Sequence, residues 1–133
     1  MSQKRVFGKY LEQFPEEVRK IALNLRVLIL KIIPRVVETV RPGMKWITYG
    51  VPKSILAIKP QSNHVRLYFF EGVQLDNSNG LLRGSGTRMR FLTITNFVSL
   101  KDKIGDLVDQ AWDINKKKYI WIQKEVFRVP RMS

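Results

Sequence analysis

The architecture of this chain depends first on residues 45–70, KWITYGVPKSILAIKPQSNHVRLYFF, where three strand-like runs follow one another closely. The runs are Lys45–Tyr49, Ser54–Lys59 and Val65–Phe70, and the residues between them include the turn formers Gly, Pro, Ser and Asn. Connections of this length suit hairpins and leave no room for the crossover that parallel strands need. The stretch therefore predicts an antiparallel meander.

The last of these runs also predicts how the sheet is covered. Side chains alternate between the two faces of a strand, so Val65, Leu67 and Phe69 lie together on one apolar face, which we expect helices to cover. The other face is mixed in character, and we expect it to be partly open. It carries His64, Arg66, Tyr68 and Phe70.

Apolar residues at helical spacing predict one long helix on each side of the meander. Pro15–Ile33 opens with a proline and two glutamates, which suit a first helical turn, and the following proline ends it. Ser99–Lys124 opens with Ser99 and Asp102, which resemble a capping box. The shorter expected elements are a helix over residues 7–14, a turn or first strand over 36–40, a strand over 89–95 and a loose tail over 128–133.

Length and composition limit the class of protein. A chain of 133 residues, 44% of them hydrophobic, fits one domain with its own core. The absence of cysteine excludes disulfides and thiolate chemistry, the apolar runs are too short to cross a bilayer, and the N-terminus lacks the pattern of a signal peptide. We therefore expect a single α+β domain over residues 1–133, with an antiparallel sheet packed against N-terminal and C-terminal helices, in the cytoplasm and without a membrane partner.

The charge of the chain is strongly positive, with 24 Lys and Arg against 11 Asp and Glu and a net charge of +13. Such a field attracts polyanions, but the basic residues are spread along the chain and do not form one block. A nucleic-acid-binding surface and an unspecialised basic surface therefore both stay open. The candidates for nucleic acid combine charge with rings on which bases stack, or lie in a lysine run on the last helix: Arg66, Tyr68, Phe70, Lys116, Lys117 and Lys118.

A second candidate site is the loop GVQLDNSNGLLRGSGTRMR, residues 72–90, between two expected strands. Its glycines Gly80, Gly84 and Gly86 allow backbone turns that a Cβ would resist. Its arginines bring planar cationic groups that suit carboxylate or phosphate, and they are Arg83, Arg88 and Arg90. The spacing of the glycines matches neither a nucleotide phosphate loop nor a dinucleotide fingerprint.

A pocket forms if this loop meets the turn after Tyr49 at one end of the sheet. Such a pocket has an aromatic wall and a cationic rim, although Trp46 can equally lie in the core. The predicted ligand-binding residues are Lys45, Trp46, Tyr49, Arg83, Ser85, Thr87 and Arg90.

Metal and catalytic chemistry have little support in the sequence. The only histidine has no partner at ligand spacing, and no serine or threonine has a recognisable base. A row of four carboxylates on the last helix can in principle collect a cation, but an acidic first half and a basic second half also complement the helix dipole on a solvated face. The row consists of Asp102, Asp106, Asp109 and Asp113. We therefore expect no metal, no cofactor and no catalytic residue, and a protein that is not an enzyme.

Three strings together resemble the YdhG-like family, a group of small bacterial and archaeal domains of unassigned function. They are MKWITYGVP (44–52), HVRLYFFEGVQL (64–75) and GLLRGSGTRMRFLTI (80–94). The resemblance covers most of the chain and implies an α+β domain with an antiparallel sheet between or beneath the first and last helices. Some members are described as frataxin-like intracellular iron chaperones. This chain differs from them in its strong positive charge and in having its carboxylate row on the last helix.

The function expected from the sequence is the binding of a small anionic ligand or an acidic partner through the glycine and arginine loop. Nucleic-acid binding is the alternative, and iron delivery is a third. We expect Arg83 and Arg90 to contribute more to anion affinity than Lys116–Lys118, because guanidinium groups held by a turn and a strand lose little freedom on binding.

Overall fold

The computed structural model describes residues 2–128, with side chains described as far as Lys117. Within these residues, five strands form one sheet in which each strand pairs antiparallel with the next along the chain. The strands are β1 (Val37–Arg41), β2 (Trp46–Gly50), β3 (Ser54–Pro60), β4 (Val65–Phe69) and β5 (Arg90–Ile94). The predicted antiparallel meander is confirmed, and the open choice at residues 36–40 is settled as a strand.

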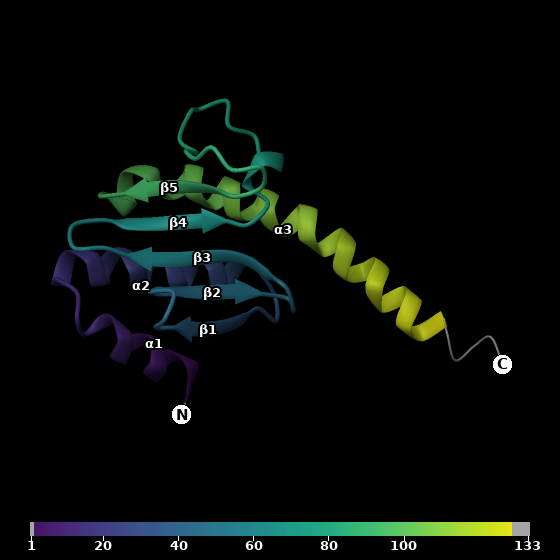
Figure 1. The fold of residues 1–133 in the computed structure, drawn as a ribbon, viewed down its shortest axis with the longest axis horizontal. Helices are drawn as coiled ribbons and strands as arrows, with labels where there is room; N and C mark the ends of the chain where they lie inside the picture. Colours follow the sequence, from purple (N-terminus) through teal and green to yellow (C-terminus); the bar gives the residue numbers. More distant parts are fainter. Residues whose placement is uncertain (1, 129–133) are drawn as a thin grey trace.

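The long helices α2 (Glu16–Ile32) and α3 (Phe97–Arg128) contact each other and share one face of the sheet, behind the strands in the view of Figure 1. The short helix α1 (Gln3–Leu11) contacts β1, and a single turn of 3-10 helix, η1 (Gly72–Gln74), follows β4. The predicted α+β architecture with N-terminal and C-terminal helices on an antiparallel sheet is therefore confirmed. Residues 129–133 of the predicted loose tail lie outside the described residues.

The start of α3 differs from the sequence prediction. The helix begins at Phe97, and the side-chain oxygen of Asn96 accepts a hydrogen bond from the backbone N–H of Ser99 at 3.2 Å. Asn96 thus occupies the capping position, and Ser99 lies inside the first turn. The predicted capping box of Ser99 and Asp102 is wrong, because an asparagine three residues ahead of Ser99 already satisfies the free N–H group.

The core lies between the sheet and the two long helices. On β4, Val65, Leu67 and Phe69 are buried, as predicted, while Arg66 and Tyr68 point to the opposite face and stay partly exposed. In the neighbouring strands, Ile47 pairs with Ile58 and Tyr49 with Leu56 on the core face, while Thr48 and Ala57 on the other face are also buried. The helices contribute Ile21, Leu25, Ile29, Ile104, Leu107 and Val108.

One carboxylate is buried in this apolar layer. Glu38 of β1 accepts a hydrogen bond from Arg26 Nε of α2 at 2.8 Å and another from the hydroxyl of its register partner Tyr49 at 2.6 Å. The guanidinium of Arg26 also lies over the ring of Phe7 in α1, 5.3 Å from its centre. Burial raises the pKa of the Tyr49 phenol above its ordinary value, and the neighbouring Glu38 carboxylate raises it further. The contact joins two helices to the first two strands.

Replacing the Tyr49 hydroxyl tests this buried contact. Tyr49→Phe should lower the free energy of unfolding by about 1–3 kcal/mol at neutral pH, because Glu38 stays buried but loses one of its two donors. The raised pKa keeps the phenol protonated in the folded protein, whereas the unfolded chain ionises it above its ordinary pKa of 10.0. The wild-type protein therefore loses this stability as the pH rises above that value, and the difference from the variant should shrink by up to about 1.4 kcal/mol per pH unit.

Denaturant unfolding of both proteins between neutral and strongly alkaline pH measures this difference. The lysines and the remaining tyrosines titrate in both proteins, so their contributions cancel in the difference between the two free energies of unfolding. A difference that stayed constant with pH would contradict a buried, protonated Tyr49.

Candidate functional site

The face of the sheet opposite the long helices carries four aromatic rings, which we call the aromatic cluster. It consists of Trp46 on β2, Tyr68 on β4, Phe70 just after β4 and Phe91 on β5, all partly exposed. The ring centre of Trp46 lies 5.7 Å from that of Tyr68 and 5.6 Å from that of Phe70, and the ring centre of Tyr68 lies 5.3 Å from that of Phe91. The rings therefore form one continuous surface across the middle of the sheet.

A small residue makes this surface possible. Ala57 of β3 pairs with Thr48 on one side and with Tyr68 on the other, so it lies between the strands that carry Trp46 and Tyr68. Its methyl group leaves space above β3 through which the indole of Trp46 reaches the rings on and after β4. A larger side chain at position 57 would separate the two parts of the aromatic cluster.

Three cations lie beside the aromatic cluster, and we call them the basic row. Arg41 of β1 pairs with Trp46 in register, and Lys59 of β3 pairs with Arg66 of β4. The ammonium of Lys59 lies 5.8 Å from the centre of the Trp46 ring, and the guanidinium of Arg66 lies 4.5 Å from the centre of the Phe91 ring. Both distances allow cation–π attraction, which holds the charges next to the rings.

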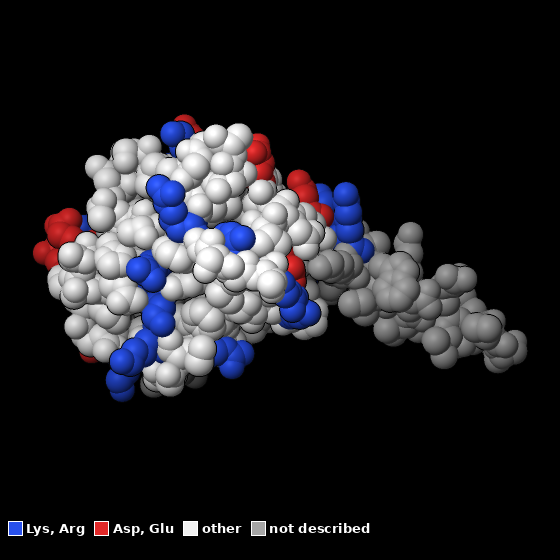
Figure 2. All heavy atoms as spheres, turned by 45° about the horizontal axis from the view of Figure 1, so that its top comes forward, with Lys and Arg blue, Asp and Glu red and all other residues white. Residues whose placement is uncertain are grey.

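No carboxylate lies among the strand residues of this face. Glu38 is the only acidic residue in β1–β5, and its side chain points into the core. None of the ion pairs within the described residues includes a member of the basic row. Figure 2, which shows this face obliquely, has basic atoms in a broken band across it and acidic atoms at the rim. The face therefore presents a positive field that nearby carboxylates do not cancel.

Two donors beneath this face have no acceptor within the described residues. They are the indole N–H of Trp46 and the Nε–H of Arg66, both shielded from solvent. Within the described residues, the hydrogen bond recorded for the guanidinium of Arg66 is a long one of 3.4 Å, from Nη1 to the hydroxyl of Tyr68. Because both donors are shielded, a bound ligand would reach them only if the side chains above them moved.

The glycine loop after η1 is held by contacts of its own. Gly72 lies against Arg90, where a Cβ would be 2.4 Å from the Arg90 Cβ and 2.7 Å from its backbone nitrogen. The guanidinium Nη1 of Arg90 donates to the carbonyl of Gly86 at 2.6 Å and to that of Met89 at 2.7 Å. Arg90 therefore fixes the end of the loop, and its Nη1 donors are taken up by loop carbonyls.

The three loop glycines predicted to need a special backbone do not behave alike. Gly80 and Gly84 have positive φ angles of 70° and 125°, as expected of residues that a Cβ would strain. Gly86 has no positive φ, and no atom lies within 4 Å of the position that its Cβ would take. The prediction for Gly86 is wrong because the turn is formed by the two earlier glycines.

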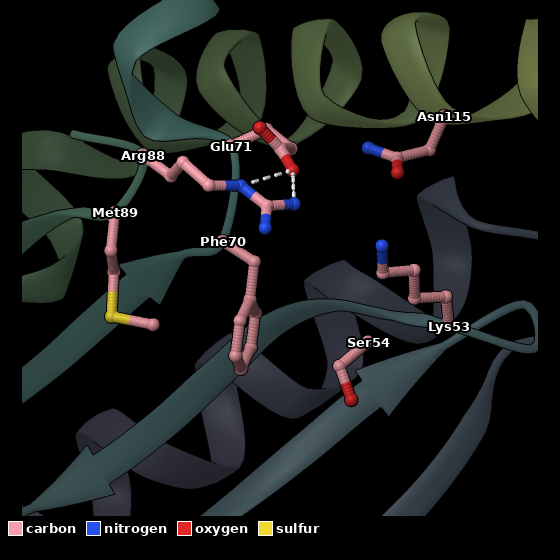
Figure 3. Close-up of a pocket in the computed structure, with 7 residues that line it drawn as sticks. All are labelled: Lys53, Ser54, Phe70, Glu71, Arg88, Met89 and Asn115. Atoms are coloured by element: carbon pink, nitrogen blue, oxygen red, sulfur yellow. Dashed lines mark hydrogen bonds and ion pairs between the residues drawn. The ribbon is translucent and has the colours of Figure 1, made fainter.

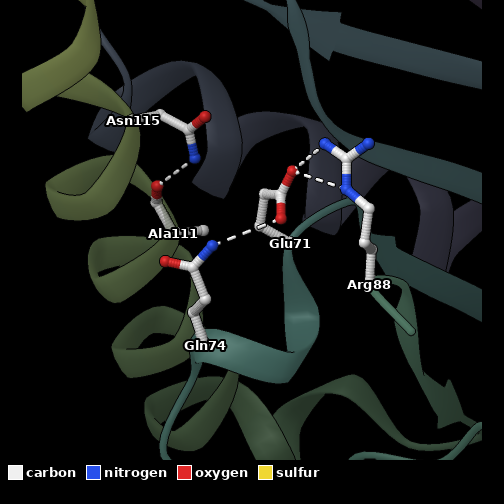
Figure 4. Close-up of polar contacts among 5 residues, drawn as sticks. All are labelled: Glu71, Gln74, Arg88, Ala111 and Asn115. Carbon is white, nitrogen blue, oxygen red and sulfur yellow. Dashed lines mark hydrogen bonds and ion pairs between the residues drawn. The ribbon is translucent and has the colours of Figure 1, made fainter. Parts of the chain in front are cut away.

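The turn after Tyr49 and the glycine loop do meet at one end of the sheet. Lys53 from the turn and Ser54 at the start of β3 face Arg88 and Met89 from the loop across a pocket of about 370 Å³, drawn in Figure 3. Arg88 forms an ion pair with Glu71, which also accepts a hydrogen bond from Gln74 at 3.2 Å, as Figure 4 shows. The expected pocket is present, but different residues line it.

The residues predicted to bind a small ligand are scattered. Tyr49 is fully buried on the core face, so it is not available to a ligand. Lys45 lies in the turn before β2, at the end of the strand away from the pocket, with a φ of 58°. Ser85 and Thr87 are exposed in the loop. Arg83 pairs through its backbone with Phe91, and Trp46 belongs to the aromatic cluster.

The residues predicted to bind nucleic acid fall into two groups. Arg66, Tyr68 and Phe70 lie together on the open face, as the alternation of β4 predicts. Lys116 and Lys117 lie on α3 instead, and Lys116 forms an ion pair of 2.8 Å with Asp113. The predicted Lys118 lies outside the described side chains.

Sequence reasoning missed Arg41, Lys59 and Phe91, which complete this face. The signal for Lys59 is the short turn between the second and third runs, because a hairpin centred on residues 61–64 places Lys59 opposite Arg66. Arg41 and Phe91 follow from the same alternation once the neighbouring strands are placed. The residues of the pocket carry no such signal, since they come from a turn, a loop and a distant helix.

Comparison of the chain with protein-family models, curated proteins and solved structures finds no significant match. The resemblance to the YdhG-like family therefore stays a prediction. Within the described residues, no helix combines the length and apolar character needed to cross a membrane.

The contact of Gly72 with Arg90 can be tested with a matched pair of variants. Gly72→Ala should lower the free energy of unfolding by about 1–3 kcal/mol, because the added methyl group meets the backbone of Arg90. Gly86→Ala makes the same chemical change in open space, and it should alter stability by no more than about 0.5 kcal/mol. Denaturant unfolding of the three proteins compares them, and equal effects of both changes would contradict the structural role of Gly72.

The aspartate row of α3 provides a second test. Asp102, Asp106, Asp109 and Asp113 are exposed, and no group of three or more acidic or histidine side chains in the described chain is placed to hold a metal ion. We expect iron or manganese to leave the melting temperature unchanged, because carboxylates spread along a solvated helix do not converge on one point. Thermal unfolding with each metal measures this. A rise in melting temperature that Asp106→Asn with Asp109→Asn abolished would show a metal site there.

Proposed function

We propose that this protein binds single-stranded nucleic acid on the open face of its sheet. The observation that carries the proposal is the aromatic cluster lying beside the basic row on a face without strand carboxylates. Rings on which bases stack, set beside cations that contact phosphates, are the two parts that single-strand binding needs.

The Tyr68 and Phe91 rings and the basic row occupy neighbouring tracks across the strands, and Trp46 lies in the track of the basic row as the register partner of Arg41. Tyr68 and Phe91 are register partners in one track, and Lys59 and Arg66 are register partners in the next. Positions two residues apart on a strand are separated by about 7 Å. A strand of nucleic acid that crosses the sheet at right angles to the β-strands can thus place bases on one track and phosphates on the other.

An extended sheet face also favours single strands over duplexes. The bases of a duplex are stacked on each other, and their flat faces do not reach rings that lie level with a sheet. The bases of a single strand can turn toward Tyr68, Phe70 and Phe91, and each base–ring contact contributes roughly 1–3 kcal/mol. The specificity expected from such a face is for strandedness more than for sequence.

The contacts of the glycine loop give less support to anion binding by its arginines. Arg90 donates to loop carbonyls, and Arg88 is paired with Glu71. The pocket of Figure 3 is therefore a better candidate site for a small anionic ligand than the arginines named from the sequence. A cytoplasmic location and a purely binding, non-catalytic role complete the proposal.

Binding of a labelled single-stranded oligonucleotide, followed by fluorescence anisotropy over a range of salt concentrations, tests the proposal. Affinity should fall steeply with salt, and each of Arg41→Ala and Lys59→Ala should reduce the slope of log K against log salt by about 0.7, the share of one phosphate contact on a single strand. Tyr68→Leu and Phe91→Leu should each weaken binding roughly 5- to 150-fold through the loss of stacking, with the salt slope unchanged.

Lys101→Ala and Lys103→Ala are the matched controls, because they remove the same charge from the exposed side of α3. They should change neither the affinity nor its salt slope by more than the loss of net charge requires. If the controls weakened binding as much as the basic-row variants, an unspecialised basic surface would explain the data. If neither oligonucleotide nor duplex bound, the proposal would be wrong.

A further inference from the structure

The pocket at the end of the sheet is continuous with the open face. Phe70 lines the pocket and also belongs to the aromatic cluster, 5.6 Å from Trp46. A strand of nucleic acid on the aromatic cluster therefore enters the pocket when it turns at Phe70, from the track of Tyr68 and Phe91 toward the ends of the β-strands. The volume of about 370 Å³ lies within the range of small-molecule sites.

One half of the pocket is polar and carries a positive charge. Figure 3 shows the ammonium of Lys53 directed toward the side that holds Asn115 and the Arg88–Glu71 pair. None of the ion pairs within the described residues involves Lys53. With two cations and one carboxylate in its lining, the pocket has a net charge that suits an anion.

Hydrogen bonds orient the polar groups around this charge. Asn115 Nδ2 donates to the carbonyl of Ala111 at 2.7 Å, which leaves the amide oxygen of Asn115 as an acceptor (Figure 4). Arg88 donates to Glu71 through Nε and one terminal nitrogen, so its other terminal nitrogen can still donate. The pocket thus offers donors for an anionic group and an acceptor for an amino or hydroxyl group.

The other half of the pocket is flat and apolar. It is formed by the ring of Phe70 and the side chain of Met89, with the hydroxyl of Ser54 at its edge. A planar heterocycle fits against an aromatic ring and a thioether better than an aliphatic chain does, because both surfaces attract its π-system. An anionic group and a flat ring in one ligand are the chemistry of a nucleotide.

We infer that this pocket holds one nucleotide, with a terminal phosphate beside Lys53 and the base against Phe70. A terminal phosphate carries a charge of roughly −1.5 to −2 at neutral pH, as a phosphate monoester does, whereas an internal phosphodiester carries a single charge. A pocket with net positive charge therefore favours the terminal group. The nucleotide is either the phosphorylated end of a strand, in which case the inference rests on the proposed function, or a free nucleoside monophosphate.

Four probes separate these sources. They are one oligonucleotide with a 5′-phosphate, with a 3′-phosphate or with hydroxyls at both ends, and a nucleoside monophosphate alone. The wild-type protein should bind one phosphorylated end roughly tenfold more tightly than the hydroxyl-ended strand, the gain expected of a charge-assisted hydrogen bond. Lys53→Ala and Lys53→Gln should both abolish that preference, whereas Lys101→Ala should keep it.

The outcomes distinguish the two proposals. Tight binding of all three oligonucleotides without an end preference would overturn the pocket site and leave the open-face proposal standing. Binding of the nucleoside monophosphate alone, lost in Lys53→Gln, would support the pocket and overturn the open-face proposal. No binding of any probe, or a preference that survives both Lys53 variants, would overturn the pocket site. Because Lys53 is exposed, thermal unfolding should show both variants to be as stable as the wild type.

Discussion

The geometry of this protein depends on the contacts that the buried carboxylate of Glu38 makes with Arg26 and Tyr49. The carboxylate receives Arg26 from α2 and Tyr49 from β2, so it fixes the first strand against both a helix and its neighbour. Removing one partner of a buried ion pair typically costs about 3–5 kcal/mol, since the remaining charge is left without compensation. A shift in the register of β1 would therefore break this contact and lose the free energy that it contributes to folding.

Register matters here because it decides which side chains face solvent. A slip of one residue would turn every side chain of β1 to the opposite face. Glu38 would then lie on the open face, and the charge of Arg41 would be lost from the basic row. The polar contact inside the core thus secures the absence of carboxylates on the outside, where the positive field is formed.

Much of this architecture can be predicted from the sequence, because short connections leave few ways to arrange the strands. The alternation of Val65–Phe69 correctly separates core from open face, and apolar spacing correctly places both long helices. Tyr49 shows the limit. Its hydroxyl and the aromatic strand around it suggest an exposed site, but its acceptor, Glu38, is eleven residues away on another strand.

The glycine loop shows a second limit. Arginines beside glycines predict anion binding, yet Arg90 turns back to the loop carbonyls, and this choice depends on backbone geometry that composition does not encode. The lining of the pocket escaped prediction for a related reason. Its lining joins a turn, a loop and Asn115 of α3. Lys53 and Asn115 are 62 positions apart in the chain, and they come together only once the sheet and α3 are assembled.

The backbone bridge between Arg83 and Phe91 has a consequence for the outer edge of the sheet. Its two hydrogen bonds, of 2.8 and 2.9 Å, occupy peptide groups on the outer edge of β5. At the opposite end of the sheet, α1 packs against β1. Unpaired outer strands recruit strands from other molecules and start aggregates. By covering part of each margin, the loop and the first helix reduce the unpaired backbone through which the sheets of two molecules could join edge to edge.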